Sequence, residues 1–251
     1  MDKYGLIGFP LGHSFSISYF NEKFQNENID AVYVNYEIPS INNLGEILES
    51  NPELRGLNVT IPYKQQVMPY LNFISPEAKA IGAVNVIKVI RSKQKILLKG
   101  FNSDVIGFTR SISSMLEPIH KNALILGTGG ASKAIDYGLK SLGVKTLFVS
   151  RTKRAENTIS YDDVTPDLLQ KYQVVVNCTP IGMYPRADEC PKLPYEAMNS
   201  HTLLYDLIYN PDETLFLRKG KAYGATTVNG LEMLLLQAFA SWEFWNGSNQ
   251  L

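Results

Sequence analysis

Residues Ala123–Ala134 read Ala-Leu-Ile-Leu-Gly-Thr-Gly-Gly-Ala-Ser-Lys-Ala, and they join a short apolar run to a glycine-rich turn and the start of a helix. Gly127 permits a tight turn, and Gly129 lets the backbone come close to a ligand. The N–H groups at the start of such a helix are free to bind phosphate. The fingerprint G-x-G-x-x-G is incomplete, because Ser132 stands at the third glycine position. The segment is therefore either a dinucleotide-binding turn or only a tight turn.

The next predicted strand, residues 145–150, favours the dinucleotide-binding turn. It ends in Ser150-Arg151-Thr152-Lys153-Arg154. An NAD site usually carries Asp or Glu about twenty residues after the glycines, where the carboxylate binds the ribose 2′-hydroxyl. Here the region is basic, and Arg151 and Arg154 can hold a 2′-phosphate through charge-assisted hydrogen bonds. The sequence predicts NADP(H) as the cofactor.

Strands and helices alternate along the 251 residues, which is typical of α/β proteins with mainly parallel sheets. The glycine turn usually follows the first strand of its own domain, so the long segment before it must form a separate domain. We expect a substrate-binding catalytic α/β domain over residues 1–103 plus 231–251. A Rossmann-like NADP-binding domain is expected over residues 104–230, with the active-site cleft between the two.

Hydrophobic periodicity predicts the individual elements. Helices are expected over residues 17–26, 41–49, 64–71, 105–116 and 230–245. Strands are expected over residues 4–8, 31–36, 56–61, 84–90, 96–101, 123–126, 145–150, 174–177, 203–207 and 226–228.

Composition excludes several classes of protein. Hydrophobic residues make up 45% of the chain, enough for a sizeable core, and 24 basic residues balance 24 acidic ones. We therefore expect no nucleic-acid partner, and no apolar stretch is long enough for a membrane span. The first residues lack the pattern of a signal peptide. Cys178 and Cys190, without CxxC spacing, favour a reducing compartment, so we expect a cytoplasmic protein.

The sequence predicts no metal site. His13, His120 and His201 are far apart, and no cluster of carboxylates or thiols accompanies them.

Polar residues gather where predicted strands end, which is where open α/β sheets bind ligands. In Gly12-His13-Ser14-Phe15-Ser16, the two serine hydroxyls either bind a small anion or polyol or cap a helix. Asn58 and Thr60 share one strand face, because side chains alternate along a strand. Lys64 follows at the carboxyl end of that strand, and it is either a site residue or a solvated surface lysine.

Further polar residues follow the later strands. Asp104 either caps the next helix or places a carboxylate in a cleft, where a lysine and an aspartate together could handle the proton of a ketone reduction. Thr179 follows the strand at 174–177, and Tyr209 follows the strand at 203–207. Gln237 is a lone amide in an apolar helix, where it either faces a polar ligand or is an ordinary core or surface amide.

Taken in order, these segments resemble the shikimate dehydrogenase family over nearly the whole chain. The matching pieces are Gly12–Ser16, Asn58–Lys64 (Asn-Val-Thr-Ile-Pro-Tyr-Lys), Gly82–Asn85, Asn102–Asp104, Gly127–Ala131, Asn177–Met183, Asp206–Pro211 and Gly230–Met233 with Gln237. The piece that ends at Lys64 is specific, and the ordered set is much more so.

The resemblance implies reversible reduction of 3-dehydroshikimate to shikimate with NADPH, in aromatic amino-acid biosynthesis. It assigns catalysis to Lys64 and Asp104 and leaves open which of them carries the transferred proton. It assigns substrate binding to Ser14, Ser16, Asn58, Thr60, Lys64, Asn85, Asp104, Tyr209 and Gln237. It assigns cofactor binding to Gly127, Gly129, Gly130, Ala131, Ser150, Arg151, Thr152, Arg154, Thr179, Met183 and Gly230.

Three positions depart from the family pattern. Ile17 stands where proline commonly follows the paired serines, Phe20 where histidine is common, and Ser103 where threonine precedes the catalytic aspartate. These changes bear on the shape of the first loop and on substrate preference.

Two alternatives stay open. A quinate/shikimate dehydrogenase would accept NAD and more polyols, although the basic end of the strand at 145–150 argues against it. A non-catalytic NADPH-sensing module would bind the cofactor without needing Lys64 or Asp104. A monomer and a homodimer are equally compatible with the sequence.

Overall fold

The computed structural model describes residues 1–12, 15–93, 95–152 and 156–247. The chain divides into two compact units, Met1–Ser103 with Ala238–Leu251, and Asp104–Gln237. The division therefore falls inside the last helix, between Gln237 and Ala238, and not before that helix at residue 231 as the sequence suggested.

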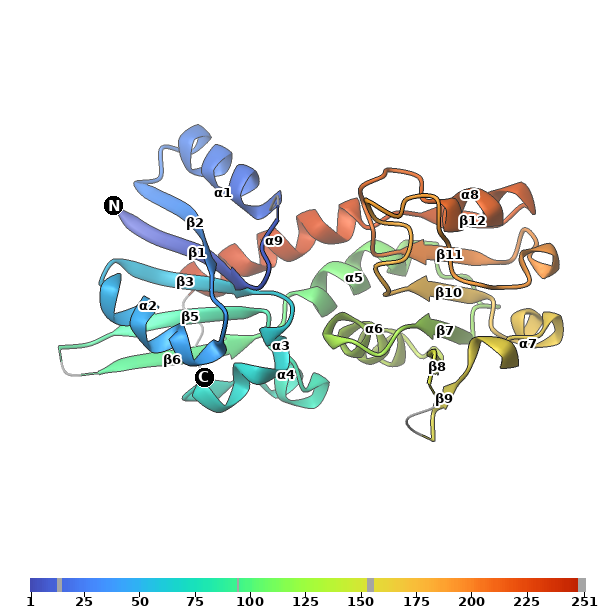
Figure 1. Ribbon diagram of the computed structural model, residues 1–251, viewed down its shortest axis with the longest axis horizontal. Helices are drawn as coiled ribbons and strands as arrows, with labels where there is room; N and C mark the ends of the chain where they lie inside the picture. The colour runs from blue at the N-terminus through green and yellow to red at the C-terminus, as the bar shows by residue number, and fades with distance from the viewer. Residues whose placement is uncertain (13–14, 94, 153–155, 248–251) are drawn as a thin grey trace. The chain divides into compact units, whose positions relative to one another are not determined.

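The first unit contains one six-stranded sheet in the order β2-β1-β3-β5-β6-β4 (Figure 1). Its strands are β1 Asp2–Gly8, β2 Ala31–Glu37, β3 Leu54–Val59, β4 Phe73–Ile74, β5 Val86–Arg91 and β6 Ile96–Phe101. Strand β5 is antiparallel to both neighbours, and the other pairs are parallel. The sheet is therefore mainly parallel, as expected, with one reversed strand.

Helices cover both faces of this sheet. The helices of the first unit are α1 Phe15–Asn26, α2 Leu44–Ser50, α3 Tyr63–Gln66, α4 Pro76–Ile81 and the second half of α9 Leu231–Asn246. Along β1 the side chains alternate: Ile7 packs with α2 in one cluster, whereas Tyr4 and Leu6 pack with α1 and with Trp245 of α9 in another. This alternation gives the sheet one apolar cluster on each face.

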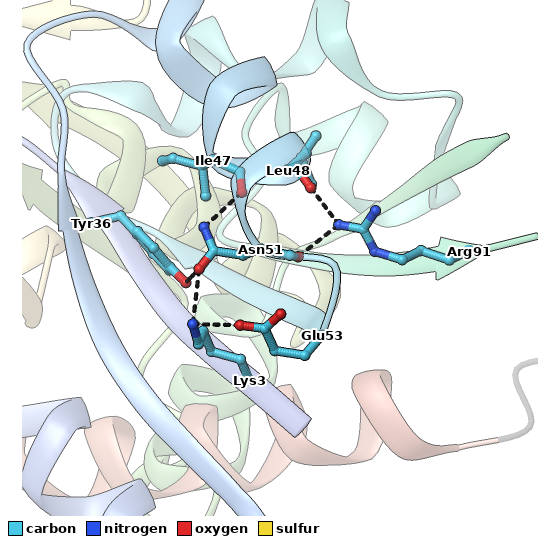
Figure 2. A network of polar contacts seen from close by, with 7 residues as sticks. All are labelled: Lys3, Tyr36, Ile47, Leu48, Asn51, Glu53 and Arg91. Carbon is cyan, nitrogen blue, oxygen red and sulfur yellow. Dashed lines mark hydrogen bonds and ion pairs between the residues drawn. The ribbon is translucent and has the colours of Figure 1, made fainter. Parts of the chain in front are cut away.

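The end of α2 is held by side chains from two strands (Figure 2). Arg91 of β5 donates from Nη2 to the main-chain oxygens of Leu48, at 2.6 Å, and Asn51, at 2.9 Å. Asn51 in turn donates to the oxygen of Ile47 and accepts a hydrogen bond from Lys3 Nζ of β1. The last carbonyls of a helix lack partners within it, so these contacts fix α2 to the sheet.

The second unit has a six-stranded sheet in the order β12-β11-β10-β7-β8-β9, with every pair parallel. Its strands are β7 Asn122–Leu126, β8 Lys145–Val149, β9 Thr158–Ile159, β10 Val174–Asn177, β11 Leu203–Asp206 and β12 Thr226–Val228. Its helices are α5 Asp104–Ile112, α6 Gly130–Ser141, α7 Pro166–Lys171, α8 Leu215–Ala222 and the first half of α9.

The central strands of this sheet are buried on both faces, which explains their continuous apolar sequence. Ile125 of β7 packs with α5 and α6 on one face, whereas Leu124 and Leu126 pack with α7 and α8 on the other. The strand order and the flanking helices confirm the Rossmann-like expectation.

Several short elements were not predicted, and two predicted helices are divided. No periodic pattern in the sequence predicted β4, β9, α4, α7 and α8, each of eight residues or fewer. The predicted helix 64–71 is α3 followed by a 3-10 turn at Met68–Tyr70, because Pro69 cannot donate the N–H that a continuous helix needs. The predicted helix 41–49 likewise begins as a 3-10 turn, Ile41–Asn43.

Within the described ranges, no helix is both long and apolar enough to cross a membrane.

Candidate functional site

The glycine turn of the second unit adopts a conformation that favours glycine. Gly127 follows β7 with φ of +99°, which L side chains rarely adopt. Its N–H donates to the oxygen of Val149, at the end of β8, over 2.8 Å. A Cβ atom at Gly127 would lie 3.1 Å from Cγ2 of Thr179. The turn is therefore held between β8 and the loop that follows β10.

The helix after the turn presents an uncapped N-terminus. Gly129 is the N-cap of α6 and makes no side-chain cap, and Gly130 and Ala131 are the first residues of the helix. A Cβ atom at Gly129 would meet nothing within 4 Å, so the space in front of the helix is open. Ser132, at the third glycine position, is buried, and its Oγ donates 2.7 Å to the oxygen of Gly129. Serine is small enough for this position and also tightens the turn.

The predicted 2′-phosphate residues follow β8. Ser150 donates its N–H to Ile159 and is half-buried, whereas Arg151 and Thr152 are exposed. Arg154 lies outside the described residues. A guanidinium at the end of β8 can donate two parallel hydrogen bonds to one phosphate. A carboxylate at this position would repel the phosphate.

The loop after β10 is held by a fully buried carboxylate. Asp206, at the end of β11, accepts hydrogen bonds from Asn177 Nδ2 at 3.0 Å, Thr214 Oγ1 at 2.6 Å and the N–H of Ile208 at 3.1 Å. Asn177 Oδ1 accepts in turn from Thr179 Oγ1, at 2.7 Å. Burial raises the pKa of Asp206 to about 6, although these three donors oppose the shift.

The remaining cofactor and substrate candidates of this unit lie on loops and at α9. Gly230 precedes α9 and donates its N–H to Ile208, and a Cβ atom there would lie 2.2 Å from the oxygen of Leu207. Only glycine fits that approach. Met183 is exposed, whereas Tyr209 and Gln237 are half-buried. Burial raises the pKa of the Tyr209 hydroxyl above its ordinary value.

In the first unit, a buried tyrosine joins two of the predicted substrate residues. Tyr33 Oη donates 2.8 Å to Asn58 Oδ1, and the side chain of Ser16 hydrogen-bonds the same hydroxyl. The ring of Tyr33 stacks on Phe20 at a centroid distance of 4.8 Å. Phe20, where the family pattern commonly has histidine, is therefore a core residue under this network.

The network continues to the third predicted substrate residue. Asn58 Nδ2 donates 3.0 Å to Ser241 Oγ of α9, whose hydroxyl lies 3.2 Å from that of Ser103. Asn85 Nδ2 donates 3.0 Å to Ser103 Oγ, and Asn85 Oδ1 accepts from the Ser103 N–H at 2.7 Å. Ser103, another departure from the family pattern, is thus a buried member of the network.

The predicted catalytic residues and Thr60 take their positions from main-chain contacts. Thr60 lies one residue beyond β3, and its N–H donates to Ile7 at 2.9 Å. Lys64 is half-buried in α3, and its oxygen accepts from the N–H of Val84 at 2.8 Å. Asp104 is the first residue of α5 and is 3% exposed. Ser14 lies outside the described residues.

Sequence reasoning assigned no site role to Tyr33, Ser241 and Asp206. Tyr33 lies in a predicted apolar strand and Ser241 in a predicted apolar helix, so neither has a local signal for a site. Their hydrogen bonds connect positions far apart in the sequence. Asp206 carried a usable signal, because a carboxylate that ends a buried strand needs partners.

The thiol that follows β10 is neutral. Burial raises the pKa of the Cys178 thiol well above its ordinary value, and the charges of Asp206 and Asp104 add to the effect. Among the residues that the structure describes, no cluster of His, Cys, Asp or Glu could hold a metal ion.

Comparisons with known proteins agree with this geometry. Residues 6–87 match the family model described as the shikimate dehydrogenase substrate binding domain. A shikimate dehydrogenase (NADP(+)) from Desulforamulus reducens is 36% identical, over 97% of this chain and 89% of its own. A chorismate mutase/shikimate 5-dehydrogenase fusion protein from Clostridium acetobutylicum has a similar crystal structure, with 40% identity and a TM-score of 0.87 over 98% of this chain and 91% of its own.

A third relative was crystallised with ligands. The shikimate 5-dehydrogenase from Thermus thermophilus, in complex with NADP(H) and shikimate, is 29% identical, with a TM-score of 0.84 over 98% of this chain and 94% of its own. Sequence and fold agree over nearly the full length of both chains. On this evidence, the chain belongs to the shikimate dehydrogenase family.

Proposed function

We propose that this chain reduces 3-dehydroshikimate to shikimate with NADPH, reversibly, in the shikimate pathway of aromatic amino-acid biosynthesis. The observation that carries the proposal is the glycine turn of the second unit, with its open helix N-terminus and the exposed Arg151 after β8, in a chain whose relatives are named NADP-dependent shikimate dehydrogenases. The first unit adds a network of buried amides and hydroxyls suited to a polyhydroxylated substrate.

The residues of the second unit fit NADP(H). The open space at Gly129 and the uncapped start of α6 suit a pyrophosphate. Arg151 supplies positive charge for the 2′-phosphate, and we assign Arg154 the same role. The full set of residues proposed to hold the cofactor is Gly127, Gly129, Gly130, Ala131, Ser150, Arg151, Thr152, Arg154, Thr179, Met183 and Gly230.

Substrate binding is proposed for the polar residues of both units. Within the first unit, Ser16, Asn58 and Asn85 are held by one hydrogen-bond network, so their polar groups are fixed before the substrate arrives. The full proposed set is Ser14, Ser16, Asn58, Thr60, Lys64, Asn85, Asp104, Tyr209 and Gln237.

When bound, NADPH supplies the hydride for the ketone carbon. The developing alkoxide then needs a proton, which we assign to the ammonium group of Lys64. Asp104, the other residue proposed for catalysis, orients a substrate hydroxyl. In the oxidative direction the neutral amine of Lys64 takes the proton from the substrate hydroxyl.

The first test mixes the purified protein with shikimate and NADP⁺, then with shikimate and NAD⁺, and follows nicotinamide absorbance. Rapid reduction of NADP⁺ with little reduction of NAD⁺ is expected. A folded protein that binds NADPH but reduces neither cofactor would favour the sensing module and contradict the proposal.

One observation supports a second candidate function with a wider cofactor range. A shikimate 5-dehydrogenase from Listeria monocytogenes, 27% identical with a TM-score of 0.85, was crystallised with shikimate and NAD. A quinate/shikimate dehydrogenase that uses NAD would reduce NAD⁺ at a rate comparable to NADP⁺ and would oxidise quinate. The same assay with quinate separates the two.

We also propose that the reaction takes place in the cytoplasm. The two cysteines, Cys178 and Cys190, are both free thiols, as expected in a reducing compartment. Immunodetection in fractionated cells tests this, and recovery in an extracellular fraction would contradict it.

A further inference from the structure

The last residue of β11 is a carboxylate that touches no solvent. Asp206 is 0% exposed, and both of its oxygens are used: Oδ1 accepts from Asn177 Nδ2 and from the N–H of Ile208, and Oδ2 accepts from Thr214 Oγ1. No ion pair within the described ranges includes it. A buried carboxylate without a cation is costly, so its hydrogen bonds must be satisfied for the unit to be stable.

One arm of this arrangement leads to the glycine turn. Asn177, also 0% exposed, uses its amide on Asp206 and its carbonyl on Thr179, whose Oγ1 and N–H donate at 2.7 Å and 3.1 Å. Thr179 Oγ1 also accepts from the N–H of Ile181. The methyl group of Thr179 lies only 3.1 Å from the position that a Cβ atom on Gly127 would take, so it packs where a larger residue in the turn would collide with it.

The other hydrogen bonds of Asp206 connect it to the loop after β11 and to the N-termini of two helices. Thr214, whose hydroxyl donates to Asp206, is the N-cap of α8. Ile208, whose N–H donates to Asp206, accepts with its oxygen from the N–H of Gly230 at the start of α9. Tyr209 is the next residue along the chain. Strands β10 and β11 lie side by side, so one carboxylate connects the loops that follow both (Figure 1).

We propose that Asp206 is a positioning residue for the nucleotide site, which acts through Asn177 to fix the hydroxyl and methyl of Thr179 against the glycine turn. The inference rests on the proposed binding of NADP(H) at that turn. Asp206 and Asn177 are both fully buried, so they shape the site without forming its surface. Removing Asp206 leaves the Asn177 amide with only its longer hydrogen bond to the main-chain oxygen of Ile181, at 3.3 Å, which loosens that side chain and its hold on Thr179.

The geometry also indicates which substitution of Asp206 can keep its hydrogen bonds. An asparagine at this position keeps one carbonyl oxygen for the two donors on Oδ1, and its amide can donate to Thr214 Oγ1 in place of accepting from it. Leucine branches at the same carbon as aspartate, but it is larger and has no polar atom, so Asp206→Leu removes the hydrogen bonds and keeps the position filled. Asp206→Asn keeps the size of the side chain and most of its hydrogen bonds.

The experiment measures the dissociation constant of NADP⁺ by isothermal titration calorimetry at pH 8, with wild-type turnover of shikimate as the prior test of the proposed function. Asp206→Leu should weaken NADP⁺ about tenfold, and Asp206→Asn should regain most of that loss. In a Thr179→Val background, Asp206→Leu should add less than about a twofold effect, because the two residues act along one path.

A matched control comes from the neighbouring residue. Tyr205→Phe removes a 2.7 Å hydrogen bond to Ser111 from the opposite face of β11 and should leave the NADP⁺ affinity unchanged. Should Asp206→Leu fail to fold, Asn177→Ala interrupts the same path from its middle and should give the same loss and the same dependence on Thr179. Unchanged NADP⁺ affinity in folded Asp206→Leu, or losses that multiply independently with Thr179→Val, would overturn the inference.

These results separate the two proposals. A wild-type protein that binds NADP⁺ but does not oxidise shikimate contradicts the proposed function and leaves the positioning test intact. Normal turnover of the wild type, combined with losses of NADP⁺ affinity that are independent for Asp206→Leu and Thr179→Val, contradicts only the proposed role of Asp206.

Discussion

The hydroxyl of Tyr33 donates a 2.8 Å hydrogen bond to Asn58 Oδ1, so a residue of the aromatic core on β2 fixes an amide near the end of β3, two strands away in the sheet. The tyrosine ring is buried and stacked on Phe20, which leaves the hydroxyl little freedom to move. Asn58 is thereby oriented so that its amide donates to Ser241. One aromatic hydroxyl therefore sets the direction of both ends of the Asn58 side chain.

The first prediction follows from this contact. Tyr33→Phe keeps the stacked ring and removes the hydroxyl, so Asn58 loses its donor and Ser16 loses its partner. We expect the KM for shikimate to rise about five- to tenfold, with the affinity for NADP⁺ unchanged. Steady-state kinetics and calorimetry check this.

A matched control lies on the same strand. Tyr36→Phe also removes a tyrosine hydroxyl from β2, but that hydroxyl bonds Asn51, which is not part of the network around Asn58. Its KM for shikimate should equal that of the wild type. Equal effects of both variants would mean that the loss of stability, and not the orientation of Asn58, raises the KM.

Substitution of Lys64 tests the assignment of the proton. Its side chain is half-buried in α3, while its main-chain contact to Val84 does not depend on the side chain. We expect Lys64→Ala to lower kcat at least about a hundredfold, because a positioned acid contributes about 10²–10⁴-fold. The melting temperature should change little, and near-normal turnover would remove Lys64 from the catalytic role.

Arg151 tests the choice of cofactor. The guanidinium is exposed beyond the end of β8, and a charge-assisted hydrogen bond is worth about 1.5–3 kcal/mol. We expect Arg151→Ala to weaken NADPH about 10- to 100-fold and to leave NADH binding nearly unchanged. Equal losses for both cofactors would show that the arginine does not contact the 2′-phosphate.

Asp206 makes the stability of the protein depend on pH. Burial raises its pKa to about 6 in the folded state from 3.8, so the folded state holds this proton more tightly than the unfolded state. The associated stability is present below about pH 4 and is lost as the pH rises through 6, by about 3 kcal/mol at most.

The measurement compares wild type with Asp206→Asn in urea at several pH values. Other carboxylates titrate in both proteins, so the difference between the two unfolding free energies isolates Asp206. We expect the variant to gain stability relative to wild type from pH 4 to pH 6 and then to keep a constant difference. A difference that does not change with pH would show that Asp206 has no raised pKa.

Arg91 offers a stability test remote from the proposed site. Its side chain holds the end of α2 through two main-chain oxygens (Figure 2). We expect Arg91→Ala to lower the unfolding free energy by about 1–3 kcal/mol, because buried carbonyls lose their partners. Shikimate and NADP⁺ affinities should stay unchanged below the new melting temperature, and a large change in either would contradict a purely structural role.

The sequence determined the features that depend on local chemistry. Period-two and period-3.6 patterns located the long strands and helices, and the glycines at 127 and 129 located the turn, because these signals lie within a few neighbouring residues. The basic end of β8 indicated the cofactor for the same reason. Shorter elements such as α7 and α8 were missed, because they are stabilised by packing and not by a long periodic pattern.

Only the tertiary structure decided the partners of the buried polar groups. Tyr33 and Asn58 are brought together by two strands that are not adjacent in the sheet, and Ser241 reaches Asn58 from a helix at the other end of the chain. Asp206 meets Asn177 because β10 and β11 are paired in register. Such contacts depend on topology and register, which no local pattern of residues encodes, and burial makes each of them obligatory.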